Sequence, residues 1–324
     1  MSLIFTIAII GHYEAPLGHP KRDKQRGRIW RITYKGDHNE KKDLTKTSLD
    51  ELIEALNLDN MAQRMNAADQ IADRIGSSAI PALKSLIANK STTTQQYVHA
   101  LWLLFRLNDL NDDLLKVSLT NNNALIRLHS FRILAEEKRD AETYYPLITK
   151  ALKDIDPHVQ RAAVELLTEY RDIPTVESVL SVLHTAPIYD THLIYTSRLC
   201  LRNLLRDNDL MKQVAAKAWN EEEAGFIAGT LVDVNSAEAA GFLAIYLNQY
   251  SMPANKVRLA YQQMARYTPN AKLKDLITKA QNKENLDVEV QASMFRGIQD
   301  GLAQRGGDAG NRLNAWVHRS QKTY

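Results

Sequence analysis

The chain has 324 residues, of which 44% are hydrophobic and 24% charged, a composition ordinary for a globular protein with a sizeable core. Its one cysteine, Cys200, excludes an intrachain disulfide, a cysteine-based zinc site and a c-type haem attachment motif. The net charge of +3 does not demand a nucleic-acid partner. The charge is uneven, however, because nine of the 41 Lys and Arg residues lie between Lys21 and Lys42.

Residues 1–36 differ from the rest of the chain. The first ten residues, MSLIFTIAII, are rich in β-formers and predict a buried strand. They lack the basic start and small-residue cleavage site of a signal peptide and are too short to span a bilayer. After a loop rich in Gly, Pro and charge, residues 28–34 alternate as a second strand would. Two strands and a loop do not make an independent domain, so we expect them to pack on the first helices.

Residues 37–47 form a polar linker, DHNEKKDLTKT, and a helical array is predicted from there to the end of the chain, over 48–324. Ser48 and Glu51 have the spacing of a capping box. Beyond them, helical stretches of roughly 10 to 18 residues alternate with short breaks. Many breaks place Asp, Asn, Ser or Thr where the side chain can cap the next helix.

The helices repeat along the chain. NAADQI (66–71), HALWLL (99–104), HSFRIL (129–134) and AAVELL (162–167) align at offsets of 33, 30 and 33 residues. A fixed period in this range is typical of a solenoid, in which stacked helix pairs bury a continuous core. We therefore expect an all-α, right-handed superhelix of seven to nine helix pairs, with a period that blurs after about residue 210.

The segment DPHVQRAA (156–163) resembles the start of the second helix of a HEAT repeat. In addition, IIGHYEAPLGHPKRDKQRGRIWRITYKG (9–36) resembles the last propeller blade of large bacterial membrane-bound dehydrogenase proteins. Residues 95–206 resemble the HEAT section of the same family. The propeller-like motif consists of Gly11, His12, Tyr13, His19, Pro20, Arg28, Trp30 and Arg31.

Members of that family join a sugar-dehydrogenase-like propeller, a HEAT array and a haem-binding domain with a CxxCH motif. This chain has neither the rest of the propeller nor CxxCH. The resemblance therefore implies the middle section of such a protein, with a periplasmic or membrane-associated location and no haem or other cofactor of its own. Its partners would be protein or neighbouring domains of a longer chain.

Five polar residues are candidates for partner binding: His99, His129, His192, Arg198 and Arg202. His99 and His129 occupy equivalent repeat positions, where side chains either line a binding surface or join neighbouring repeats by hydrogen bonds. Arg198 and Arg202 are four residues apart on one helix and repel unless an acid lies between them. That acid can come from a neighbouring repeat or from a partner.

Other features have structural interpretations. His12 and His19 lack a third ligand at a recognised metal spacing. The arginines beside Trp30 fit a strand edge as well as a nucleic acid. Trp102 and Cys200 are predicted to be a core anchor and an inert buried thiol.

The sequence thus predicts a non-catalytic protein–protein or interdomain scaffold that binds through its concave surface. No recognisable nucleophile motif or set of convergent titratable groups indicates an enzyme. The alternative is a nucleic-acid-binding HEAT-like module. Against it, the chain outside Lys21–Lys42 has 32 Lys and Arg against 35 Asp and Glu.

Overall fold

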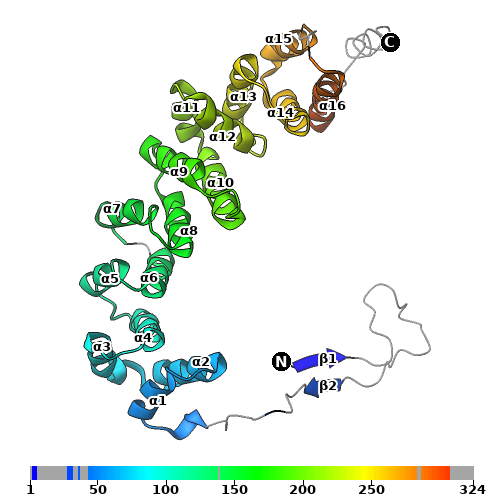
Figure 1. Ribbon diagram of the computed structural model, residues 1–324. Helices are drawn as coiled ribbons and strands as arrows, with labels where there is room; N and C mark the ends of the chain where they lie inside the picture. The colour runs from blue at the N-terminus through cyan, green and yellow to red at the C-terminus, as the bar shows by residue number, and fades with distance from the viewer. Residues whose placement is uncertain are drawn as a thin grey trace, which may run out of the picture.

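The protein is described by a computed structural model that covers residues 2–5, 28–31, 36, 43–137, 139–282 and 286–306. Within these ranges, helices α1 to α16 follow one another as an array that curves into an open C (Figure 1). The odd-numbered helices from α3 onward lie on the outer side of the curve, and the even-numbered helices line the inner side. The expected all-α solenoid of helix pairs is confirmed.

The first helices of the successive pairs are α1 (Leu49–Ala55), α3 (Ile80–Ala88), α5 (Asp112–Leu119), α7 (Ala141–Ala151), α9 (Ile173–Thr185), α11 (Asn208–Ala216), α13 (Ala237–Gln249) and α15 (Asn270–Gln281). The second helices are α2 (Met61–Asp69), α4 (Thr94–Arg106), α6 (Ala124–Glu136), α8 (Pro157–Leu166), α10 (Thr191–Leu205), α12 (Glu221–Leu231), α14 (Ala254–Tyr267) and α16 (Val288–Gln304). A π-helical turn, Gln70–Ile75, extends α2.

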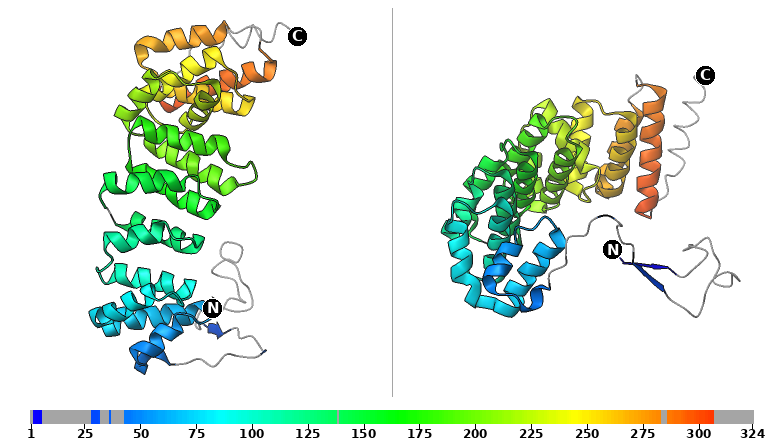
Figure 2. Two further views of the ribbon diagram at one scale, coloured as in Figure 1. Left: turned by 60° about the vertical axis from the view of Figure 1, so that its left-hand side comes forward. Right: turned by 60° about the horizontal axis from the view of Figure 1, so that its bottom comes forward.

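Two short strands, β1 (Ser2–Phe5) and β2 (Arg28–Arg31), form an antiparallel pair in which Ser2 lies opposite Arg31. This confirms a β-segment at the N-terminus, and residues 2–5 are the part of the apolar run that the structure describes. The strands lie apart from the helices (Figures 1 and 2). The expectation that they pack on the first helices is therefore wrong for the described strand residues. The two strands pair with each other instead.

The helical array begins before Ser48, within the segment that the sequence assigns to a linker. Leu44 is fully buried, and Arg74 donates hydrogen bonds to the carbonyl oxygens of Leu44 and Thr47 at 3.4 and 2.8 Å. The predicted capping box is present, since the Ser48 side chain accepts from the Glu51 amide and the Glu51 side chain accepts from the Ser48 amide. One leucine in the polar segment is thus enough to anchor it to the core.

Side-chain caps start most of the helices, as the sequence predicts. The first helical amides are bound by the side chains of Asn60, Thr93, Asn111, Asn123, Asp140, Asp156, Asp172, Asp190, Asp207, Asn220, Ser236 and Asp287. Each cap of this kind stabilises a helix by about 1 kcal/mol. The positions at which these helices start are therefore favoured by local chemistry.

The repeat alignment is confirmed by burial. The second position of each aligned motif is small and completely buried, where one helix approaches its neighbour: Ala67, Ala100, Ser130 and Ala163. The third and sixth positions carry apolar side chains that are also buried and, except for Ala68, larger: Ala68, Leu101, Phe131 and Val164, followed by Ile71, Leu104, Leu134 and Leu167. One continuous hydrophobic cluster runs from Leu44 to Leu302, as expected for stacked repeats.

A second repeated feature holds the turn inside each pair. Arg64, Arg127 and Gln160 occupy equivalent positions, and each donates a hydrogen bond to the carbonyl oxygen six residues earlier. Arg127 also binds Asp154 of the next repeat with both ends of its guanidinium, at 2.8 and 2.7 Å. The two side chains are only 13% and 12% exposed, so this pair joins two repeats out of reach of most solvent.

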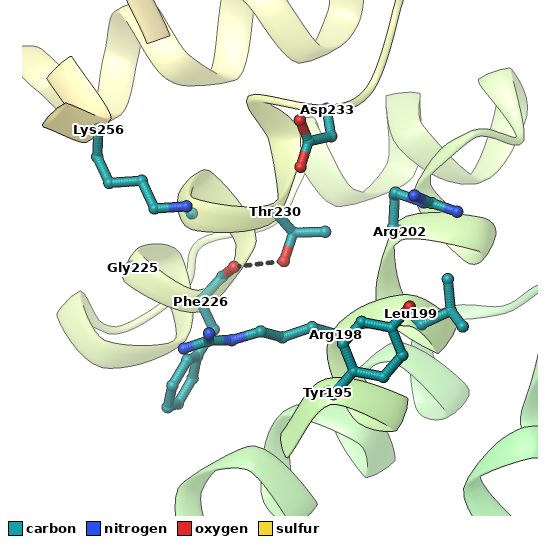
Figure 3. A pocket seen from close by; sticks show the side chains of 10 residues that line it. Tyr195, Arg198, Leu199, Arg202, Gly225, Phe226, Thr230, Asp233 and Lys256 are labelled. Carbon is teal, nitrogen blue, oxygen red and sulfur yellow. Dashed lines mark hydrogen bonds between the residues drawn. The ribbon is translucent and has the colours of Figure 1, made fainter. Parts of the chain in front are cut away.

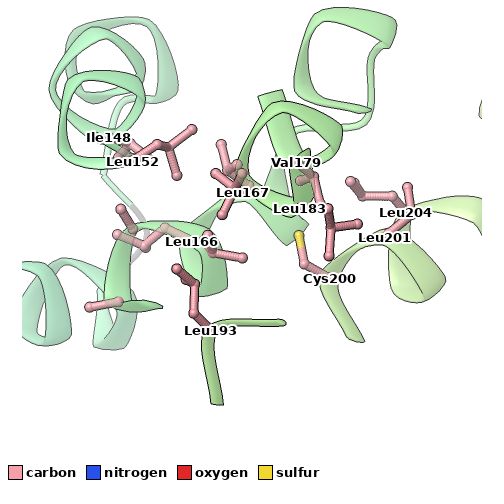
Figure 4. Packing of buried hydrophobic residues seen from close by; sticks show 14 of the residues in the cluster. Ile148, Leu152, Leu166, Leu167, Val179, Leu183, Leu193, Cys200, Leu201 and Leu204 are labelled. Carbon is pink, nitrogen blue, oxygen red and sulfur yellow. The ribbon is translucent and has the colours of Figure 1, made fainter. Parts of the chain in front are cut away.

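Cys200 lies in the core between α9 and α10, among Val179, Leu183 and Leu204 (Figure 4). Burial raises the pKa of its thiol to about 12, so the thiol stays protonated at neutral pH. The prediction that Cys200 is buried is confirmed, and its protonation favours the inert role expected of it.

The last described helix packs unusually closely. A side chain on Gly297 or Gly301 of α16 would overlap backbone atoms of α14, at Arg258 and Gln262 respectively. Only glycine permits this approach. The end of the predicted array, residues 307–324, lies outside the described residues.

Candidate binding surface

The inner side of the curve has two hollows formed by second helices. The first, which we call the amino-terminal groove, has a volume of about 580 Å³ and lies across α2, α4 and α6. It is lined mainly by apolar and aromatic side chains, with polar groups at intervals: Met61, Arg64, Met65, Ala68, Gln95, Val98, His99, Trp102, Leu103, Phe105, Arg106, Leu125 and His129.

Large apolar side chains in this groove are open to solvent. Met61 is 68% exposed, Met65 47% and Leu125 41%. Trp102 and Phe105 are half-buried between them, with their rings edge to face and 5.9 Å between centroids. Trp102 therefore has an apolar body fixed in the helix stack and a face available to the groove. The predicted core role of Trp102 is only part of what this residue does.

The two predicted histidines both line the groove, where they differ in their contacts. Trp102 Nε1 donates a hydrogen bond to His129 Nδ1 at 3.0 Å, which links α4 to α6. Burial, followed by the nearby Arg132 and His99, lowers the pKa of His129. Burial and Arg64 lower the pKa of His99. Both imidazoles are therefore neutral at pH 7 and suit an apolar surface better than a charged one would.

The cations at the edge of the groove are already engaged. Arg106 of α4 binds Asp69 at 2.8 Å and Asp73 at 2.9 Å, which ties the second repeat to the first. Arg64 holds the preceding turn through its carbonyl oxygens. The groove therefore offers apolar contact and neutral hydrogen-bonding groups, while Arg106 is paired with acids and Arg64 is bound to carbonyl oxygens.

The second hollow, which we call the α10–α12 pocket, has a volume of about 270 Å³. It is lined by Tyr195, Arg198, Leu199, Arg202, Gly225, Phe226, Gly229, Thr230, Asp233 and Lys256. Arg198 from α10 and Lys256 from α14 both reach toward α12 (Figure 3). This pocket is more polar than the amino-terminal groove and has three cations to one carboxylate.

Four of the five predicted partner-binding residues thus lie in the two hollows: His99 and His129 in the first, Arg198 and Arg202 in the second. His192 lies near the start of α10, is exposed and lines neither hollow. In the propeller-like motif, Arg28, Trp30 and Arg31 belong to β2. Gly11, His12, Tyr13, His19 and Pro20 lie outside the described residues.

Sequence reasoning missed the groove's exposed apolar side chains, Met61, Met65 and Leu125, and the pocket's Phe226 and Lys256. The sequence does contain a signal for Met61, Met65 and Leu125, because α2 and α6 have more apolar residues than a single buried face of a helix requires. The pocket brings together three helices far apart in sequence, which no local pattern reports.

Among the described residues, no group of three or more His, Cys, Asp or Glu side chains is placed to hold a metal ion. Within the same residues, no helix has both the length and the apolar character needed to cross a membrane.

No protein-family model matches the chain, and no curated protein matches it in sequence. Some solved structures are distantly similar to it. An X-ray structure of YibA from E. coli is similar with a TM-score of 0.44 and 14% identity, over 81% of this chain and 99% of that one. A crystal structure of an engineered protein is similar with a TM-score of 0.36 and 16% identity, over 78% of each chain.

Proposed function

We propose that this protein is a non-catalytic scaffold that binds partner proteins along the inner side of its curve. The observation that carries the proposal is the group of exposed apolar side chains in the amino-terminal groove. Isolated exposed leucines or methionines need no explanation, but several around a half-buried tryptophan mark an interaction surface. The partner segment that fits is amphipathic, with apolar side chains that cover Met65, Trp102 and Leu125.

The chemistry of the groove favours this kind of partner. Methionine side chains adapt to the shape of what they touch, and an aromatic anchor gives much of the binding energy of a protein interface. The neutral His99 can exchange a hydrogen bond with a backbone or side-chain group of the partner. Phosphate-rich ligands fit poorly, because Arg106 is already paired with two carboxylates.

Site-specific photo-crosslinking in the source cells tests the proposal. A photoreactive phenylalanine derivative replaces Met65 or Leu125 in the groove, with Ile155 as the control position. Ile155 is 96% exposed and lies between α7 and α8, outside both hollows. We expect the same partner protein to be crosslinked from positions 65 and 125 and not from 155. Equal crosslinking from all three positions, or crosslinks to nucleic acid alone, would contradict the proposal.

The resemblance of residues 9–36 and 95–206 to membrane-bound dehydrogenase proteins supports a narrower role. In this form of the proposal, the array sets the distance between a catalytic propeller and a haem domain of one longer chain. An immunoblot of fractionated cells, stained in parallel for covalent haem, tests it. A haem-positive membrane or periplasmic band several times larger than 36.7 kDa is expected. A haem-free band near 36.7 kDa would instead identify a free-standing scaffold.

A further inference from the structure

We infer that the α10–α12 pocket binds a carboxylate side chain from an acidic segment of a partner protein, with Arg198, Arg202 and Lys256 as the cationic contacts. The inference rests on the protein-binding role proposed for the inner side of the curve. It adds a second contact of different chemistry, centred on α12, four helix pairs beyond α4 at the centre of the apolar groove.

In the described part of the chain, Asp233 is the one carboxylate in the lining of the pocket, and it forms no ion pair with the three cations. Within the described ranges, no carboxylate forms an ion pair with Arg198, Arg202 or Lys256. Arg202 reaches only Asn203 Oδ1, at 3.5 Å, and its buried Nε has no hydrogen-bond partner among the described residues. A buried donor without an acceptor is destabilising, and a bound carboxylate would supply the acceptor.

The spacing of the two arginines adds to this cost. Arg198 and Arg202 are four residues apart on α10, where like charges lie side by side and repel. Some arginines at the repeat junctions are paired with carboxylates, as Arg127 is with Asp154. Arg198 and Arg202 have no such pair among the described residues, so their mutual repulsion is not offset within the array.

Two glycines in the middle of α12 point to the same pocket. Glycine destabilises a helix interior relative to alanine. A Cβ on Gly229 would meet no atom within 4 Å, and one on Gly225 would meet only the Tyr246 hydroxyl, at an ordinary 3.4 Å. Packing thus does not require glycine here, unlike at Gly297. The effect of both is to leave the α12 wall bare between Arg198 and Lys256, so that a ligand can approach the helix.

Residues that destabilise the folded protein and are not required for its packing are expected at binding sites. Here unmatched cations, a buried free donor and helix glycines meet in one hollow. Tyr195, which is 67% exposed, and Phe226 give the pocket apolar walls for the methylene groups of a glutamate. A nucleic acid needs a longer positive track, and outside Lys21–Lys42 the chain has more acidic than basic residues. An acidic peptide is the ligand that fits.

Fluorescence anisotropy with a fluorescein-labelled peptide of alternating glutamate and leucine tests the inference. We expect the double variant Arg198→Gln/Arg202→Gln to weaken binding by about tenfold or more, and higher salt to weaken it in the wild type. Arg206→Gln is the control, because Arg206 is an exposed arginine next to α10 that does not line the pocket. Equal affinity of the wild type and the double variant would overturn the inference.

A second pair of variants separates binding from folding. Gly229→Leu fills the pocket and should abolish peptide binding without lowering the unfolding midpoint. Gly241→Leu is the matched control, since Gly241 lies inside α13, also has open space around it and is outside the pocket. Full binding by Gly229→Leu would refute the site, as would tighter binding of a single-stranded oligonucleotide than of the peptide. If the peptide does not bind while the crosslinks from the amino-terminal groove are still observed, the inference about the α10–α12 pocket is wrong and the proposed scaffold function is unaffected.

Discussion

The indole nitrogen of Trp102 donates a hydrogen bond to Nδ1 of His129, so that one residue of α4 fixes the ring of its neighbour on α6. An indole N–H can only donate, which means that His129 must be unprotonated at Nδ1. This bond joins two repeats at the floor of the amino-terminal groove. It gives the groove a defined shape before any partner arrives.

Replacing Trp102 with phenylalanine tests this bond. The ring keeps most of its apolar contact, whereas the donor to His129 is lost. We expect the free energy of unfolding to fall by about 1–3 kcal/mol, from the lost hydrogen bond and the smaller ring. Urea unfolding measures it. A variant as stable as the wild type would show that the bond adds nothing.

Acid should destabilise the array through the same residues. The pKa values of His99 and His129 are lowered from the ordinary 6.5 by burial, so the unfolded chain takes up these protons at a higher pH than the folded chain. Their contribution to stability is complete above about pH 6.5 and is lost as the pH falls toward the lowered values.

The measurement compares urea unfolding at about pH 7.5 and about pH 5.5 for the wild type and for His129→Gln, which cannot titrate. The loss of stability on acidification should be smaller in the variant. His192→Gln serves as the control because His192 is exposed and its side chain has no hydrogen bond or ion pair among the described residues. The same pH dependence in the wild type and His129→Gln would show that this imidazole is not the acid-sensitive group.

The pair of Arg127 and Asp154 should matter more than surface ion pairs. Arg127→Ala leaves a mostly buried carboxylate unpaired and also releases the turn at Asn121, so a loss of about 3 kcal/mol is expected. Lys212→Ala removes an exposed pair with Asp209, which solvent screens, and should leave the stability nearly unchanged. Similar losses of stability for the two variants in thermal or urea unfolding would mean that the buried pair contributes no more than an exposed one.

The close contact of α16 with α14 predicts a strong effect of one methyl group. Gly301→Ala places a Cβ against the backbone of Gln262, so α16 must shift, at a cost of about 1–3 kcal/mol. Hydrogen exchange should increase in α14 and α16 and stay unchanged in α4. Uniform exchange across the array would argue against a local contact of this kind.

Much of the fold follows from local patterns in the sequence. Ser48 with Glu51 and Asp156 with Pro157 predict helix starts because a cap is decided within four residues. The offsets among residues 66–167 predict the stack because each repeat must bury the same face. The burial of Leu44 is not predictable in this way, because a single apolar residue in a polar segment has no period and the core it joins is formed by residues later in the chain.

The candidate sites were predicted less completely. His99 and His129 stand out because they share a repeat position, and Arg198 and Arg202 because like charges adjoin. Lys256 and Gly229 give no such signal, since their meaning depends on the curvature that brings α10, α12 and α14 together. Four residues of the sites could therefore be named from the sequence, but not the hollows that they line.

The most direct test of the central claim is the dissociation constant of the partner captured by crosslinking, measured for the wild type, Leu125→Lys and Ile155→Lys. Both positions are exposed and apolar, but only Leu125 lines the groove. A scaffold that binds through its inner side should lose at least about tenfold in affinity with Leu125→Lys and keep wild-type affinity with Ile155→Lys. Equal affinities for all three proteins would contradict that account.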